Sequence, residues 1–101
     1  MPYGLTEEDL TTIRDAARRF PDIRQVILFG SRAKGNYKPG SDIDLAIKGK
    51  DVDYDTTVKL AETLNEETLL PYFVDVLHYE SLTEPDLIDH IDRIGQTLYP
   101  A

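Results

Sequence analysis

The segment Phe29–Leu45, FGSRAKGNYKPGSDIDL, carries most of what this sequence says about fold and chemistry. A short apolar run ends in a glycine-serine pair, and a basic segment with spaced glycines follows. Asp42 and Asp44 then stand one residue apart, inside a second apolar run. A strand that is to be buried should not carry two negative charges, so the pair requires an explanation.

Alternation along a strand gives these two carboxylates a common direction. We predict a strand over residues 42–47, with Asp42 and Asp44 on one face and Ile43 and Leu45 on the opposite, core-forming face. Residues two apart on a strand are separated by about 7 Å, so the carboxylates can share one cation or hold two. Their mutual repulsion favours such a cation. Oxygen ligands favour Mg²⁺, Mn²⁺ or Ca²⁺.

Asp75 is the third candidate carboxylate. It lies inside a predicted strand over residues 72–77, where a lone charge is costly. If the two strands are neighbours, Asp75 can face the same site as Asp44, and such carboxylates with one or two divalent ions are typical of phosphoryl transfer. A turn residue at Asp42, or an exposed edge at Asp75, is the simpler interpretation of each residue alone. Charges inside two separate apolar strands favour a shared site.

The glycine-serine pair predicts the phosphate-binding half of such a site. Gly30 allows the backbone to approach a ligand closely, and Ser31 offers a hydroxyl at the start of a turn whose N–H groups can bind an anion. Arg32, Lys34 and Lys38 make this segment the most basic part of an acidic chain. A glycine-serine pair alone is weak evidence, because most are ordinary turns. Its spacing from the acidic pair strengthens the prediction.

Helical patterns flank and separate the predicted strands. Thr6 caps a helix that ends before Pro21, and Asp53 or Asp55 caps a second helix. Pro85 lies in the first turn of a last helix.

The strand pattern then decides the fold class. The apolar run over residues 25–29 is the first strand, and the predicted order is α-β-β-α-β-α. A short connection makes the first two strands antiparallel, and a helical crossover makes the second and third parallel. We therefore predict an α/β (α+β) fold, a small mixed sheet with flanking helices and one face partly free.

Four residues outside this pattern receive structural interpretations. His78 follows the third strand, and we give it no functional role. His90 is assigned to a polar face of the last helix. Leu98 and Tyr99, near the C-terminus, are expected to dock on the domain or on a partner.

Composition restricts the classes of function. A chain of 101 residues fits a single domain, residues 1–101. Its formal net charge of −8 repels polyanions and counts against a nucleic-acid template. It has no cysteine, which suits the reducing cytoplasm, and no apolar run approaches the roughly 20 residues that span a bilayer. We expect a cytoplasmic protein; its oligomeric state is left open.

The spacing of these motifs resembles a known family. Gly30-Ser31, ten intervening residues and Asp42-Ile43-Asp44 are similar to the signature of the DNA polymerase beta-like nucleotidyltransferase superfamily. The resemblance is strongest to its minimal prokaryotic members, the MNT proteins, and covers residues 25–77. The later VDV, with Asp75, resembles the strand of the third carboxylate.

The resemblance implies a role for each matching residue. It implies that Gly30 and Ser31 hold the terminal phosphates of the nucleotide, and that Asp42 and Asp44 bind two Mg²⁺ ions. Asp75 would complete the metal site and help to deprotonate the attacking hydroxyl. Arg32 and Lys34 are proposed only as neighbours of the phosphates.

The resemblance also implies an acceptor. Minimal nucleotidyltransferases are often paired with a helical HEPN-type partner in toxin–antitoxin modules, which implies AMP transfer from ATP to a tyrosine hydroxyl of a toxin. Two alternatives stay open. The chain could neutralise its partner by contact alone, or transfer a nucleotide to a small molecule, although 101 residues leave little room for a small-molecule pocket.

Overall fold

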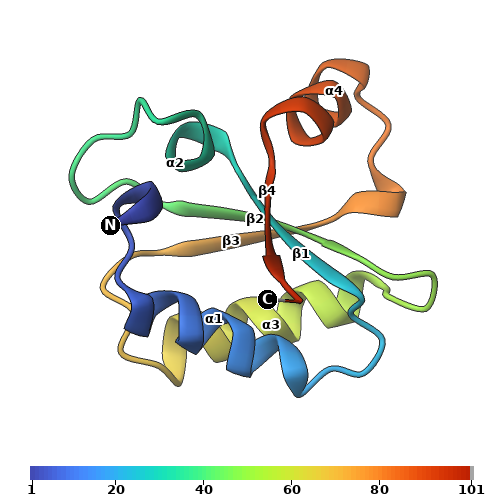
Figure 1. Ribbon diagram of the computed structural model, residues 1–101. Coiled ribbons are helices and arrows are strands. Elements are labelled where there is room, and N and C mark those ends of the chain that lie inside the picture. The colour runs from blue at the N-terminus through green and yellow to red at the C-terminus, as the bar shows by residue number, and fades with distance from the viewer. Residues whose placement is uncertain (101) are drawn as a thin grey trace.

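The computed structural model describes residues 1–100 and forms a mixed four-stranded sheet with α-helices on both faces (Figure 1). This architecture confirms the predicted fold class. The elements are η1 (Pro2–Gly4), α1 (Glu7–Arg18), β1 (Gln25–Phe29), α2 (Gly30–Lys34), β2 (Ile43–Lys48), α3 (Tyr54–Glu66), β3 (Val74–His78), η2 (Tyr79–Ser81), α4 (Pro85–Ile94) and β4 (Gln96–Tyr99).

The strands lie in the order β3-β2-β1-β4. β1 pairs antiparallel with β2, and β2 pairs parallel with β3, as predicted. β4 was not predicted; it pairs antiparallel with β1 and extends the sheet. Four residues after Gly95 are too few to show a strand pattern. Burial of Leu98, which is 2% exposed, fits the expectation that this segment docks on the domain.

Side-chain caps fix where the two long helices begin. The Thr6 hydroxyl accepts a hydrogen bond from the Asp9 N–H, and the Asp9 carboxylate accepts one from the Thr6 N–H, each at 3.0 Å. Asp53 and Thr56 form the same reciprocal pair at α3, so Asp53 is the cap. Each pair satisfies N–H groups that the first turn leaves free. Within residues 1–100, no helix combines the length and the apolar content needed to cross a bilayer.

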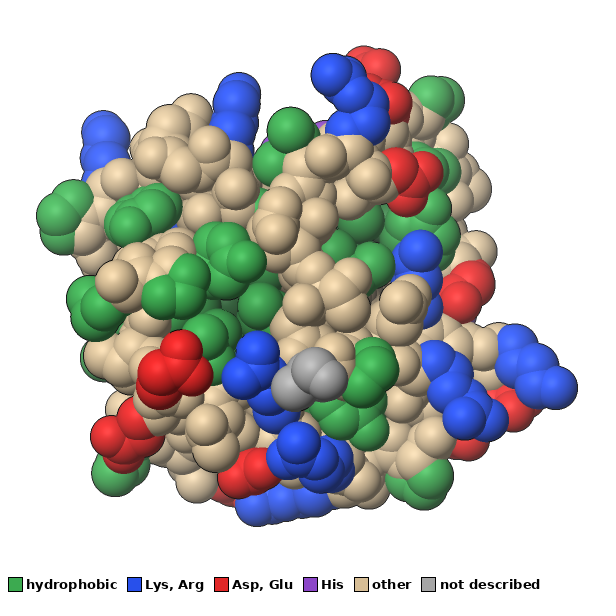
Figure 2. Space-filling model, viewed as in Figure 1, with side chains coloured by type: hydrophobic (Ala, Val, Ile, Leu, Met, Phe, Trp, Pro, Cys, Tyr) green, Lys and Arg blue, Asp and Glu red, His purple; other side chains and the backbone are tan. Residues whose placement is uncertain are grey.

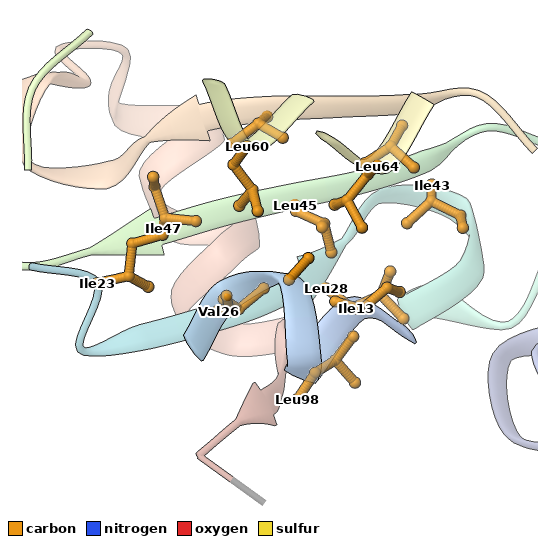
Figure 3. Close-up of a cluster of buried hydrophobic side chains, with 14 of the residues drawn as sticks. Ile13, Ile23, Val26, Leu28, Ile43, Leu45, Ile47, Leu60, Leu64 and Leu98 are labelled. Atoms are coloured by element: carbon orange, nitrogen blue, oxygen red, sulfur yellow. The ribbon is translucent and has the colours of Figure 1, made fainter. Parts of the chain in front are cut away.

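One face of the sheet forms the larger core. Alternate residues of β2, Ile43, Leu45 and Ile47, are fully buried against α1 and α3 (Figure 3). Leu60 and Leu64 of α3 and Ile13 of α1 pack there as well. This is the face that the alternation of Asp42-Ile43-Asp44-Leu45 predicted for the core.

The opposite face is covered in part by α2 and α4 (Figure 1). Ile27, Phe29 and Ala46 of the sheet form a smaller cluster there with Ile91 of α4. Leu77 and Leu82 pack against this cluster. Asp44 and Asp75 on the same face are half-buried and exposed, which agrees with the predicted partly free face.

Leu98 provides the test of the β4 strand. We expect Leu98→Ala to lower the free energy of unfolding by about 2–4 kcal/mol, because it removes a buried side chain and leaves a cavity. Thr97→Ala, at an exposed position of the same strand, should change it by less than about 0.5 kcal/mol. Urea denaturation measures both. Equal transition midpoints for the two variants would contradict the docking of β4.

Candidate active site

Two carboxylates of the predicted site lie side by side on neighbouring strands. Asp44 of β2 and Asp75 of β3 are direct register partners in the parallel pair. Adjacent strands are about 4.8 Å apart, and register partners point to the same face. From the sequence, we predicted that Asp75 faces the same site as Asp44 if their strands are neighbours, and β2 and β3 are neighbours. Asp44 is half-buried and Asp75 is exposed.

Asp42 lies just outside the strand. β2 begins at Ile43, one residue later than predicted, and Asp42 is exposed in the loop before it. Its negative charge nevertheless contributes to raising the pKa of Asp44. Asp42 is therefore close enough to act electrostatically on Asp44.

The surroundings of Asp44 disfavour its charged form. Burial is the largest cause that raises the pKa of the Asp44 carboxyl above its usual range. The charges of Asp75 and then Asp42 raise it further, whereas His90 acts in the opposite direction. A carboxylate with this environment is stabilised when a cation is added.

Gly30 is required by its contact with this carboxylate. Its φ is +74°, a left-handed conformation that favours glycine. A Cβ atom at this position would collide with the carboxylate of Asp44. The turn after β1 therefore approaches Asp44 as closely as it does only because residue 30 has no side chain. This contact joins the glycine-serine turn to the acidic pair, as their spacing suggested.

His90 of α4 is a member of this site that the sequence analysis missed. The Gly30 N–H donates a hydrogen bond to His90 Nε2 at 2.9 Å, and the imidazole packs edge-on against Phe29, with ring centres 6.2 Å apart. The assignment of His90 to a merely polar helix face was wrong. The available signal was spacing, because His90 lies three residues after Leu87 and four before Ile94 on the apolar stripe of the helix.

Arg32 has a structural use that its sequence context did not reveal. The side chain is 2% exposed, and its guanidinium donates to the Ser41 carbonyl at 2.6 and 3.0 Å and to the Tyr3 carbonyl at 2.9 Å. It also lies over the rings of Tyr37 and Tyr72, at 5.3 and 4.2 Å from their centres. These contacts tie the loop before β2 to the N-terminal turn. A role of Arg32 beside the phosphates stays a prediction that these contacts do not support.

The other two phosphate candidates are accessible. Ser31 is half-buried in the first turn of α2, and Lys34 is exposed at its end. Figure 2 shows basic side chains projecting above α2 and the loop that follows it. Ser31 and Lys34 thus share with Gly30 the segment next to Asp44, and their contact with a nucleotide stays a prediction.

The carboxylates fit a hard divalent cation in chemistry. All their donor atoms are oxygens, two of the three are in register, and the raised pKa of Asp44 shows repulsion that a cation would offset. Within the described chain, however, no three acidic or histidine side chains converge into a ready-made cage. Metal binding by Asp42, Asp44 and Asp75 is therefore a prediction that rests on donor type and placement.

Comparison with known families supplies the identification. Residues 11–101 match the family described as "Polymerase beta, Nucleotidyltransferase". The chain belongs to this nucleotidyltransferase family. The match extends over nearly the whole chain and confirms the family that the sequence motifs suggested.

Known proteins similar to the chain include toxin–antitoxin components. It is 26% identical to a chain of a solved toxin–antitoxin complex with AMP-PNP, covering 92% of this chain and 74% of that one with a TM-score of 0.75. A complex of a tri-AMPylated Shewanella oneidensis HEPN toxin with its MNT antitoxin gives 24% identity, 91% and 70% coverage, and a TM-score of 0.68, which shows the fold alone.

One curated protein matches over a shorter segment. This Methanocaldococcus jannaschii protein, named a putative protein adenylyltransferase, is 50% identical over 42 residues. The match covers 42% of this chain and 41% of the relative's length.

The electrostatic strain at Asp44 makes a testable prediction. A raised carboxyl pKa means that the native state binds more protons than the unfolded state, so stability falls as pH rises from about 3.9 through the raised pKa of Asp44. We expect Asp44→Asn to be more stable than the parent at pH 7 without divalent ions, by a few tenths to about 1 kcal/mol after screening by solvent. The difference should shrink toward pH 4.

Urea denaturation in EDTA between pH 4 and 8 measures this difference. Asp51→Asn removes an exposed carboxylate elsewhere and should show no comparable gain. An Asp44→Asn variant that is less stable than the parent at every pH would refute the assignment of repulsion and burial to this site.

The contacts of Arg32 make a second prediction. Arg32→Ala should lower the free energy of unfolding by about 2–4 kcal/mol, because it removes charge-assisted hydrogen bonds and leaves partly buried carbonyls without donors. Lys34→Ala, at an exposed position of the same helix, should have little effect on stability. Thermal denaturation measures both. Arg32→Ala with an unchanged melting temperature would mean that these contacts contribute nothing to stability.

Proposed function

We propose that the chain transfers AMP from ATP to an acceptor hydroxyl, a tyrosine of a HEPN-type helical partner, and thereby acts as an antitoxin. The observation that carries this proposal is the in-register pair Asp44–Asp75 with the Gly30 turn packed against Asp44, in a chain of the nucleotidyltransferase family. The turn at Gly30, proposed to bind phosphate, and the carboxylates of Asp44 and Asp75 then lie within one site.

Each residue has a task that follows from its position. The acceptor oxygen attacks the α-phosphorus of ATP and a new P–O bond forms. The bond from that phosphorus to the bridging oxygen breaks, and pyrophosphate leaves with the electron pair. Asp75, exposed and next to Asp44, is available to take the proton of the hydroxyl. Gly30, Ser31 and Lys34 are the candidates for holding the terminal phosphates.

Asp42, Asp44 and Asp75 are the candidates for holding Mg²⁺, with two ions implied by the resemblance. When bound, Mg²⁺ would neutralise phosphate charge and stabilise the attacking and leaving oxygens. Without a cation, the negative charges of these carboxylates would repel a polyanionic nucleotide. Binding of the metal would therefore favour binding of the nucleotide.

Relatives support the donor and the partner. One solved relative is a toxin–antitoxin complex with AMP-PNP, and another is an MNT antitoxin in complex with a tri-AMPylated HEPN toxin. The name of the curated relative supports a protein acceptor. The net charge of −8 also favours a protein acceptor over a nucleic-acid template.

Intact-mass spectrometry tests the proposal directly. The chain is incubated with ATP, Mg²⁺ and the protein encoded by the neighbouring reading frame, and we expect the partner to gain the mass of one or more AMP groups. Asp42→Asn/Asp44→Asn should reduce the transfer to background, because it removes the cation ligands. Asp51→Asn, a carboxylate outside the site, should leave the rate unchanged.

Protection of cells from the partner separates this function from neutralisation by contact. The double Asn variant should lose protection while it still co-purifies with the partner. Full protection by that variant, with no AMP added to any acceptor, would favour the contact-only alternative.

A further inference from the structure

A groove runs between α3 and the outer edge of β3, and it reaches the active site. Its volume is about 440 Å³, and Asp75 belongs to its lining. Val58 and Ala61 of α3 contribute apolar surface. Tyr54 and Phe73 line it too and are 79% and 59% exposed, although they are large apolar side chains. Exposed aromatic surface around a concave apolar site is typical of a place where another molecule binds.

The backbone edge beside the groove is only partly available. β3 pairs with β2 alone and is therefore an edge strand of the sheet (Figure 1). Val74, Asp75 and Val76 of this strand line the groove. The Asn65 side chain already covers that edge at Val74: its Oδ1 accepts from the Val74 N–H and its Nδ2 donates to the Val74 carbonyl, both at 2.8 Å. The N–H and C=O of Val76 point to the same side of the strand as those of Val74, because the backbone groups of alternate residues do so. His78 is the next alternate residue, and its carbonyl already accepts a hydrogen bond from the Ser81 hydroxyl at 3.0 Å. Val76 is then the one residue of β3 whose outer N–H and C=O are both open, which is enough for a short segment and too little for a long added strand.

The charge on the groove selects its occupant. Glu62 and Glu66 lie one turn apart on α3, both exposed, and they line the groove together with Asp75. None of the three forms an ion pair within residues 1–100. A triphosphate would be repelled here, whereas lysine or arginine side chains would be attracted. The exposed basic residues Lys34 and Lys38 belong to α2 and the loop after it.

We propose that this groove is the acceptor-docking site. It receives a short basic segment of a protein, with an aromatic or aliphatic side chain against Val58 and Ala61, Lys or Arg beside Glu62 and Glu66, and a hydroxyl directed toward Asp75. The inference rests on the proposed function, because it names the acceptor surface of the same site. It adds a specificity: the modified hydroxyl belongs to a segment rich in basic and apolar residues.

Two synthetic peptides test the groove. Each has twelve residues with a single tyrosine flanked by leucines; the outer positions are Lys and Arg in one peptide and Glu in the other. Amide shifts of the ¹⁵N-labelled full chain are followed on titration, with and without AMP-PNP and Mg²⁺. We expect the basic peptide to shift the amides of Ala61 and Val76, and the acidic peptide to bind about two- to thirtyfold more weakly, as two exposed ion pairs predict.

Charge reversal on the groove is the matched variant. Glu62→Lys/Glu66→Lys should weaken the basic peptide by about tenfold or more and strengthen the acidic one. Glu7→Lys/Glu8→Lys changes the net charge equally on exposed residues of α1 and should not alter either affinity beyond twofold. Equal losses in both variants would mean that net charge alone decides binding and would overturn the proposal.

Other outcomes separate this proposal from the proposed function. An Ala61 amide on α3 that does not move with the basic peptide, or that moves with AMP-PNP and Mg²⁺ alone, overturns acceptor docking; Val76 follows Asp75 and is expected to respond to the nucleotide as well. Binding of the basic peptide to the groove without AMP transfer, in the presence of ATP and Mg²⁺, supports docking and counts against the enzymatic function. The Asp42→Asn/Asp44→Asn variant should bind the peptide normally, because Asp75 and both glutamates remain.

Discussion

Two like charges on neighbouring parallel strands are the constraint on which the rest of this structure depends. Carboxylates about 5 Å apart repel by about 1 kcal/mol in water and about 3 kcal/mol at an effective dielectric of 20. The residues on either side of Asp44, Ile43 and Leu45, are fully buried on the opposite face. Burial of each such side chain contributes about 1.5–3 kcal/mol, so the core face of β2 offsets the cost of its acidic face. A polar site is thereby held on a rigid strand.

Packing and hydrogen bonds hold the segment between β1 and β2 in place. Gly30 brings the turn against Asp44 because it lacks a side chain, and His90 of α4 accepts the hydrogen bond of its N–H. Arg32 holds the Ser41 carbonyl, directly before Asp42. A side chain that lies inside the basic segment therefore acts on the acidic pair through the backbone. The two halves of the motif are joined covalently, by packing and by hydrogen bonds.

The sequence predicted the parts of the fold that depend on local pattern. Strand alternation placed Ile43 and Leu45 in the core, and the connections gave the antiparallel and parallel pairings that the structure shows. β4 could not be predicted, because its four residues become a strand only by pairing with β1, which is far away in sequence. The tertiary contacts of His90 and Arg32 could not be predicted for a similar reason. A polar side chain on a helix looks solvated until its tertiary neighbours, here Gly30 and Ser41, are known.

Under the proposed function, the placement of charge would allow a chain with a net charge of −8 to bind a polyanionic nucleotide. The exposed basic residues Lys34 and Lys38 lie in the segment that follows Gly30, whereas Glu62 and Glu66 line the groove that Asp75 shares. Asp44 and Asp75 thus adjoin a basic segment, which follows Gly30, and an acidic groove, which is lined by Glu62 and Glu66. In the proposed reaction, an anionic donor and a cationic acceptor would be drawn to different sides of the same two strands, and each would be repelled from the place of the other. Separation of this kind needs no second domain, only a sheet edge that is left partly open beside the acidic pair.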